Sequence, residues 1–128
     1  MPRQNDNEHL QQIHQKAGSL YRNAKQRARD KGLKFSLTQE FIEAALKKGT
    51  CQATGVSFDF NASSGGKGQS NPWSPSLDRV NPEKGYTKDN VQVVALIYNR
   101  AKGADKEADV RLLARKLCEK NRHRNCRK

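Results

Sequence analysis

The sequence has few of the residues that build a large apolar core, and it has no long apolar run. Only 34% of its 128 residues are hydrophobic and 6% are aromatic, so we expect one domain with a modest core built from amphipathic helices. No segment approaches the roughly twenty apolar residues that a membrane span requires. The N-terminus also lacks the apolar stretch of a signal peptide. These absences predict a cytoplasmic protein that does not enter a membrane.

Cysteine and acidic residues are also scarce. Three cysteines, an odd number, argue against a disulfide framework. The 13 acidic residues stand against 25 Lys and Arg, which leaves a net charge of +12. Such a balance predicts a polyanionic partner, most simply a nucleic acid, whose affinity falls with salt. The alternative from charge alone is a soluble basic protein with no such partner.

The first part of the chain predicts two amphipathic helices. Apolar residues recur at three- and four-residue spacing from His9 to Lys31, and Gly32 is a plausible C-terminal stop. The opposite face of this helix carries six cations. A second helix, capped by Ser36 or Thr38, extends to about Lys48. Within a single domain of residues 1–128, residues 8–48 thus form a basic helical region.

The rest of the chain predicts short strands, turns and two further helices. A short strand is expected at Val56–Phe60 before a Gly/Ser-rich loop at 61–72. Strands at Ser76–Val80 and Tyr86–Val94 flank a turn, and a helix follows from about Ala95 to Lys102. A last helix over residues 105–121 is expected to close the back of the domain, ahead of a basic tail at 122–128.

The hairpin and the helix after it bring three distant polar residues together. Asp78 lies on the first strand, Asn90 on the second and Asn99 on the helix. The side chains of Asp78 and Asn99 both offer oxygen ligands to a hard divalent ion. Each residue also has a structural alternative. Asp78 can be an acid that pairs with Arg79 beside a turn, and Asn90 can cap a helix or a turn. Asn99 can be an exposed helix residue.

The pattern D-R-V-N-P-x-x-G-Y-T-x-x-N-V…Y-N-x-A-K starts at Asp78 and ends at Lys102. Together with upstream C-x-x-T-G, S-P-S-L and K-x-R-A-x-x-x-G stretches, it resembles the HNH endonuclease family. This is the ββα-metal or His-Me finger group, in the short form common among bacteriophage proteins. The resemblance implies an α+β fold with a ββα-metal finger core at residues 51–103, N-terminal amphipathic helices and a C-terminal helix. It also implies an enzyme that hydrolyses DNA phosphodiesters with Mg²⁺ or Mn²⁺, with nicking of one strand as one form.

The resemblance assigns roles to four residues and exposes one departure. Asp78 and Asn99 correspond to the metal ligands, and Asn90 to the residue that orders the finger. Arg79 stands where the family has its general-base histidine. Arginine cannot accept a proton at physiological pH, although it can clamp a phosphate and stabilise the transition state.

This departure leaves three alternatives open. The protein cuts slowly, since loss of a general base costs roughly a hundred- to ten-thousandfold. A base such as His14 enters from elsewhere. Or catalysis is lost, and the chain is a DNA-binding or host-inhibitory phage protein.

The expected partner is double-stranded DNA, although no residue excludes RNA. Because one finger cuts one strand, the protein acts as a monomer or as a homodimer. The basic residues expected to contact DNA phosphates are Arg22, Lys25, Arg27, Lys84, Lys88, Arg100 and Lys102.

Many relatives hold the finger with a structural zinc bound by two C-x-x-C pairs. Here Cys51 and Thr54 stand in place of the first pair, and Ala95 and Tyr98 in place of the second. A structural zinc is therefore not expected. Cys118, His123 and Cys126 are a further candidate set, but their C-x4-H-x2-C spacing matches no zinc signature, and free thiols are the favoured interpretation.

Overall fold

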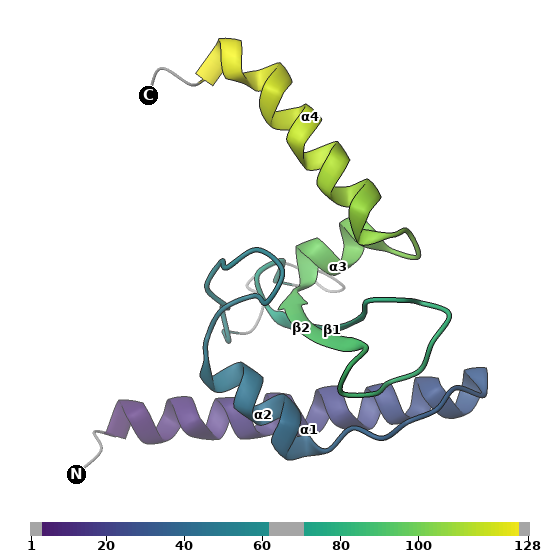
Figure 1. Cartoon of the computed structure of the whole chain (residues 1–128). Coiled ribbons are helices and arrows are strands. Elements are labelled where there is room, and N and C mark those ends of the chain that lie inside the picture. Colours follow the sequence, from purple (N-terminus) through teal and green to yellow (C-terminus); the bar gives the residue numbers. More distant parts are fainter. Residues whose placement is uncertain (1–3, 62–70, 126–128) are drawn as a thin grey trace.

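A computed structural model describes residues 4–61 and 71–125, which form four helices and a two-stranded antiparallel sheet (Figure 1). The elements in chain order are α1 (Gln4–Lys31), α2 (Gln39–Lys47), β1 (Pro75–Arg79), β2 (Val91–Ala95), α3 (Leu96–Lys102) and α4 (Glu107–Asn125). This arrangement confirms the predicted α+β class and its ββα core. None of the described helices combines the length and the apolar character needed to cross a bilayer.

The two N-terminal helices form one side of the core. The apolar stripe of α1 is buried, and it consists of Ile13, Ala17, Leu20, Ala24 and Ala28. Three alanines in this stripe allow close approach of neighbouring elements. The helix starts at Gln4, earlier than the predicted His9, and ends as expected before Gly32, whose φ is +66°. For α2 the cap is Thr38, whose hydroxyl accepts a hydrogen bond of 3.1 Å from the Phe41 N–H.

The strands β1 and β2 pair in a register that sets Asp78 opposite Gln92. Val93 and Val94 of β2 are fully buried, and α3 follows β2 directly. The predicted return strand from Tyr86 is wrong over its first part, because β2 begins only at Val91. The residues before it turn, with the Asn90 N–H donating to the Thr87 carbonyl at 3.0 Å.

The predicted strand at Val56–Phe60 is also wrong. The described structure has only an isolated bridge here, between Thr50 and Ser57. The segment folds back on the preceding turn, where the N–H of Cys51 donates to the carbonyl of Val56 at 2.7 Å. A local turn therefore takes the backbone hydrogen bonds that a second sheet strand would have used.

The last helix, α4, does not close the back of the domain as predicted. It projects away from the other elements (Figure 1). Leu113 and Leu117, which share the apolar face of this helix, are 64% and 59% exposed. The amphipathic spacing predicted the helix, but it could not show whether the body of this protein offers a surface to cover the apolar face.

A close backbone approach joins the end of α1 to the finger. The segment after α1 runs beside the β1–β2 turn, with the Tyr86 N–H donating to the Lys34 carbonyl at 2.8 Å and the Ser36 N–H to the Tyr86 carbonyl at 3.0 Å. A Cβ placed on Gly85 would lie 2.3 Å from the Lys34 oxygen, so only glycine fits here. This contact holds the basic C-terminal half of α1 against the ββα unit.

Candidate functional site

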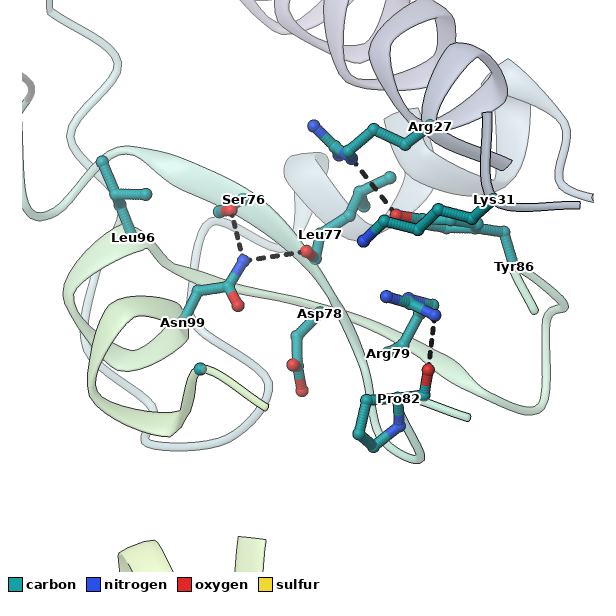
Figure 2. A pocket seen from close by; sticks show the side chains of 11 residues that line it. Arg27, Lys31, Ser76, Leu77, Asp78, Arg79, Pro82, Tyr86, Leu96 and Asn99 are labelled. Atoms are coloured by element: carbon teal, nitrogen blue, oxygen red, sulfur yellow. Dashed lines mark hydrogen bonds between the residues drawn. The ribbon is translucent and has the colours of Figure 1, made fainter. Parts of the chain in front are cut away.

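A polar pocket of about 340 Å³ lies where α1, β1 and α3 meet. Asp78 and Arg79 from the end of β1 line it, together with Asn99 from α3 (Figure 2). Arg27 and Lys31, one helical turn apart on α1, complete its charged wall. The structure thus brings the predicted metal ligands and the predicted phosphate-clamping arginine into one pocket.

Asp78 is buried, with 3% of its surface exposed, and both of its carboxylate oxygens have partners. Oδ1 accepts from the Lys102 ammonium at 3.1 Å, and Oδ2 accepts from the Gln92 amide at 2.9 Å. Gln92 reaches it because the strand register sets the two residues opposite each other. The Lys102 ammonium also donates to the Arg79 carbonyl at 3.0 Å. The carboxylate is therefore fixed in position and paired with a cation from the last turn of α3.

The placement of Lys102 corrects the prediction that it holds a flanking phosphate. The residue is 1% exposed and its ammonium points inward to Asp78. A charge that leaves water needs a partner of opposite sign, and Asp78 supplies it. Helical spacing placed Lys102 beside Asn99 but could not show which side of α3 faces the protein interior.

Asn99 presents a free oxygen to the pocket. Its amide nitrogen donates to the Ser76 hydroxyl at 2.8 Å and to the Leu77 carbonyl at 2.9 Å. Because a backbone carbonyl can only accept, the nitrogen must occupy that side. Within the described residues, Oδ1 accepts no hydrogen bond. An amide oxygen and the Asp78 carboxylate are ligands of the type that Mg²⁺ and Mn²⁺ accept, so the donor set fits in kind.

The Lys102 ammonium works against a divalent ion at this donor set. It already neutralises Asp78, and a second cation beside it would be repelled. Within the described residues, no group of three or more His, Cys, Asp and Glu side chains could hold a metal. An ion here would therefore depend on few protein ligands and would keep several waters.

Arg79 is presented to the pocket by the β1–β2 turn. Its guanidinium donates to the carbonyls of Pro82 at 2.6 Å and Lys84 at 3.2 Å, and it lies over the Tyr86 ring at 5.2 Å from the centroid. The Tyr86 hydroxyl in turn accepts from Arg27 Nε at 3.2 Å (Figure 2). Tyr86 thus holds a cation from α1 and a cation from β1 on one side chain.

Asn90 stabilises the β1–β2 turn, whose carbonyl groups also bind the Arg79 guanidinium. Its amide nitrogen donates to the carbonyls of Asn81 at 3.1 Å and Gly85 at 2.8 Å, while its side-chain oxygen accepts from the Asn81 N–H at 3.0 Å. A single buried side chain therefore satisfies three backbone groups of the turn. Through the turn, Asn90 supports the orientation of the Arg79 guanidinium.

The other predicted phosphate contacts lie outside the pocket. Arg22, Lys84 and Arg100 are exposed. Lys25 lies over the Tyr21 ring at 5.8 Å from its centroid, and Lys88 over the Phe41 ring at 5.9 Å. These cations come from α1, the β1–β2 turn and α3, and none of them lines the pocket.

Sequence reasoning missed four residues that take part in the site: Lys31, Ser76, Tyr86 and Gln92. Lys31 had a usable signal, since it lies one helical turn after Arg27. Gln92 also had one, because it is the single polar residue in an otherwise apolar strand. The hydrogen bonds of Ser76 and Tyr86 depend on contacts between separate elements, which spacing does not reveal.

No histidine with a described side chain lines the pocket. His14 contacts Glu43 of α2, with 3.2 Å between Nδ1 and Oε2, and His9 packs edge-on against Phe60 at 5.2 Å between ring centroids. His14, considered as a replacement base, is thus turned toward α2. His123 falls outside the residues with described side chains, and Cys126 and the end of the basic tail outside the described residues.

The Cys51 thiol lies in the turn that stands in place of the first C-x-x-C pair in the resemblance described above. It is 2% exposed. Burial alone raises the pKa of this thiol, yet hydrogen bonds from the Thr54 hydroxyl and from backbone N–H groups, including that of Ala95, bring the pKa below its ordinary value. Three of the four residues in place of the two C-x-x-C pairs, Cys51, Thr54 and Ala95, therefore do meet, whereas the Tyr98 hydroxyl donates to Glu107. The three meet through hydrogen bonds to sulfur.

Comparison with known proteins gives a structural likeness. The sequence matches no protein-family model, and no curated protein matches it significantly. The fold is similar to the solved structure of the rare-cutting HNH restriction endonuclease PacI, with a TM-score of 0.59 and 18% sequence identity. The similarity covers 84% of this chain and 80% of that one. The likeness establishes an HNH-like fold.

Proposed function

We propose that this protein is an HNH-type nuclease that hydrolyses DNA phosphodiesters with a divalent metal ion. The observation that carries the proposal is the pocket itself. In an HNH-like fold, it sets a buried carboxylate and a free amide oxygen beside three cationic side chains, those of Arg27, Lys31 and Arg79. A phosphodiester needs positive charge on its non-bridging oxygens and a ligand set for a metal, and both kinds of group meet here.

The residues divide into two groups in this proposal. Asp78 and Asn99 hold the ion, which supplies charge stabilisation for the phosphate and the leaving oxygen when it is bound. Arg79 contacts the scissile phosphate, since its guanidinium is held at the pocket and offers paired donors to phosphate oxygens. Arg27 and Lys31 extend the contact along the neighbouring backbone. The net charge of +12 supports a polyanionic substrate.

The proton of the attacking water has no histidine acceptor among the side chains described in the pocket. We therefore propose a slow nuclease, in which solvent or the substrate phosphate takes the proton. Loss of a general base typically costs about a hundred- to ten-thousandfold in rate. Such a rate remains measurable as conversion of supercoiled plasmid to open circle.

A second candidate function is DNA binding without cleavage, by a catalytically inactive HNH-like protein. One observation favours it: both oxygens of Asp78 are already bonded, one of them to the buried Lys102 ammonium. If the ammonium keeps the ion out, the pocket still grips a phosphate through Arg27, Lys31 and Arg79.

The test is plasmid cleavage with Mg²⁺, Mn²⁺ or EDTA, using wild type, Asp78→Asn, Arg79→His and Glu83→Gln. Asp78→Asn preserves the shape of the buried side chain, and Glu83 is an exposed acid outside the pocket, so Glu83→Gln is the matched control. If the protein is a nuclease, wild type and Glu83→Gln convert the plasmid to open circle. Asp78→Asn and the addition of EDTA each abolish this conversion. Cleavage only by Arg79→His identifies an inactive enzyme with an intact metal site. Salt-sensitive binding without cleavage by any variant identifies the binding protein.

A further inference from the structure

The projecting helix α4 carries an apolar stripe against which no other described part of the chain packs. Val110, Leu113 and Leu117 follow one another at three- and four-residue spacing, which lines them up on one face. Leu113 and Leu117 are largely exposed. Contact with the body is concentrated at the start of the helix, where the Tyr98 hydroxyl donates to Glu107 at 3.1 Å. Because helices in proteins gain most of their stability from packing an amphipathic face, α4 lacks its usual support.

Charge is unevenly distributed along α4. The first turn carries Glu107 and Asp109, and the last turns carry Lys120 and Arg122. At 100° per residue, Asp109 and Lys120 lie about 20° apart around the helix axis, on one flank of the stripe. On this flank the helix is therefore acidic near its start and basic further along, where Lys116, about 20° from Asp109 around the axis, precedes Lys120.

This distribution is complementary to a second copy of itself. If two α4 helices pack antiparallel with Leu113 opposite Leu117 of the other copy, the pair is centred on residue 115. Asp109 then lies six residues before the centre and Lys120 five residues after it, so the two residues come level to within about 1.5 Å of rise. Like flanks meet in an antiparallel pair, which brings acid to base at both ends of the seam. In a parallel pair Asp109 and Lys120 of the two copies would lie eleven residues apart along the axis, about 16 Å of rise, so this acid–base contact would be lost.

We propose that α4 is a self-association helix and that two copies of this chain pair through it in antiparallel orientation. Opposed helix dipoles favour the same arrangement. A nucleic acid suits this face less well, because phosphates gain nothing from Leu113 and Leu117. Two leucines from each copy form a small seam, so the dimer is weak and depends on concentration. The inference does not depend on nuclease activity, since it is tested without DNA or metal.

The first test is sedimentation velocity across a concentration series. Wild type is expected to shift from monomer to dimer, whereas Leu113→Glu and Leu117→Glu should each raise the dimer Kd at least about tenfold. Leu112→Glu is the matched control, because Leu112 is 45% exposed on the other side of the same helix. It introduces the same charge and should leave the dimer intact. A wild-type protein that stays monomeric up to its solubility limit overturns the proposal.

The second test exchanges the charges that antiparallel pairing brings together. Asp109→Lys and Lys120→Asp should each weaken the dimer, and the double variant should restore it, because each copy then offers a base where the other offers an acid. Far-UV circular dichroism checks that α4 remains helical in all three variants. A double variant that stays helical but is weaker than either single variant refutes antiparallel pairing. If wild type is monomeric and the leucine variants instead weaken DNA binding, α4 is a nucleic-acid contact.

Discussion

The Asp78–Lys102 pair leads to a prediction in which stability and metal binding are measured separately. Lys102→Met keeps the length of the side chain and removes its charge, which leaves the Asp78 carboxylate buried with only the Gln92 amide as partner. Removing one member of a buried ion pair costs about 3–5 kcal/mol, because an uncompensated charge remains inside. For a domain of this size, that loss lowers the Tm by about 10–20 °C.

Magnesium should reverse part of this loss if Asp78 and Asn99 are metal ligands. In Lys102→Met the ion no longer meets a competing ammonium. It replaces that ammonium as the positively charged partner of the Asp78 carboxylate. We therefore expect Mg²⁺ or Mn²⁺ to raise the Tm of Lys102→Met clearly more than that of wild type, as measured by differential scanning calorimetry. Asp78→Asn/Lys102→Met buries no charge at this place, so it should recover most of the stability without responding to the ion.

The matched control is Lys106→Met, which makes the same chemical change at an exposed lysine four residues later. It should alter stability by no more than about 0.5 kcal/mol. The reasoning on the buried pair is refuted if Lys102→Met is as stable as Lys106→Met. If Lys102→Met is destabilised but does not respond to either ion, the pair is structural and the metal assignment of Asp78 fails.

Three further predictions concern the scaffold. Gly85→Ala should cost about 2–3 kcal/mol in urea unfolding, because its Cβ meets a backbone carbonyl; Gly18→Ala, inside α1 and near only flexible side chains, should be neutral or stabilising, and equal effects would contradict the close approach. Burial and the nearby Glu107 carboxylate raise the pKa of Tyr98 to about 12, so this group stabilises the fold below pH ~10 and loses that contribution as the pH rises through its folded pKa. Tyr98→Phe should flatten the fall in Tm between these pH values, and an unchanged slope would show that Tyr98 does not contribute to it. Iodoacetamide should label Cys118 in the native protein and Cys51 only in denaturant, as read by peptide mass spectrometry; native labelling of Cys51 would show that its turn opens readily.

The ends of the N-terminal helices were predictable because their signals are local. Gly32 and Thr38 end and begin helices through their own backbone preferences, and both predictions are confirmed. The strand at Val56–Phe60 was wrong for the same reason. Alternation shows which side chains share a face, but pairing requires a neighbouring strand, and the preceding turn takes those hydrogen bonds instead.

The candidate site was predictable in composition and only partly in geometry. The sequence pattern from Asp78 to Asn99 identified Asp78, Arg79 and Asn99, and all three line the pocket. It could not show that Lys102 is buried against Asp78, since this depends on the packing of α3 against β1. The assignment of these residues to metal and phosphate binding stays a prediction until the variants above are measured.

The hydrogen bonds that the Asn90 side chain makes to the β1–β2 turn have a consequence for engineering the sequence of this turn. All three of these hydrogen bonds go to main-chain groups, so the shape of the turn does not depend on the side chains of Glu83 and Lys84, which are exposed. These two positions can therefore be randomised in a library while the turn continues to hold the Arg79 guanidinium. The turn would then serve as a variable surface beside a constant pocket, and under the proposed function selection on it would alter which nucleic-acid sequences or shapes the protein prefers.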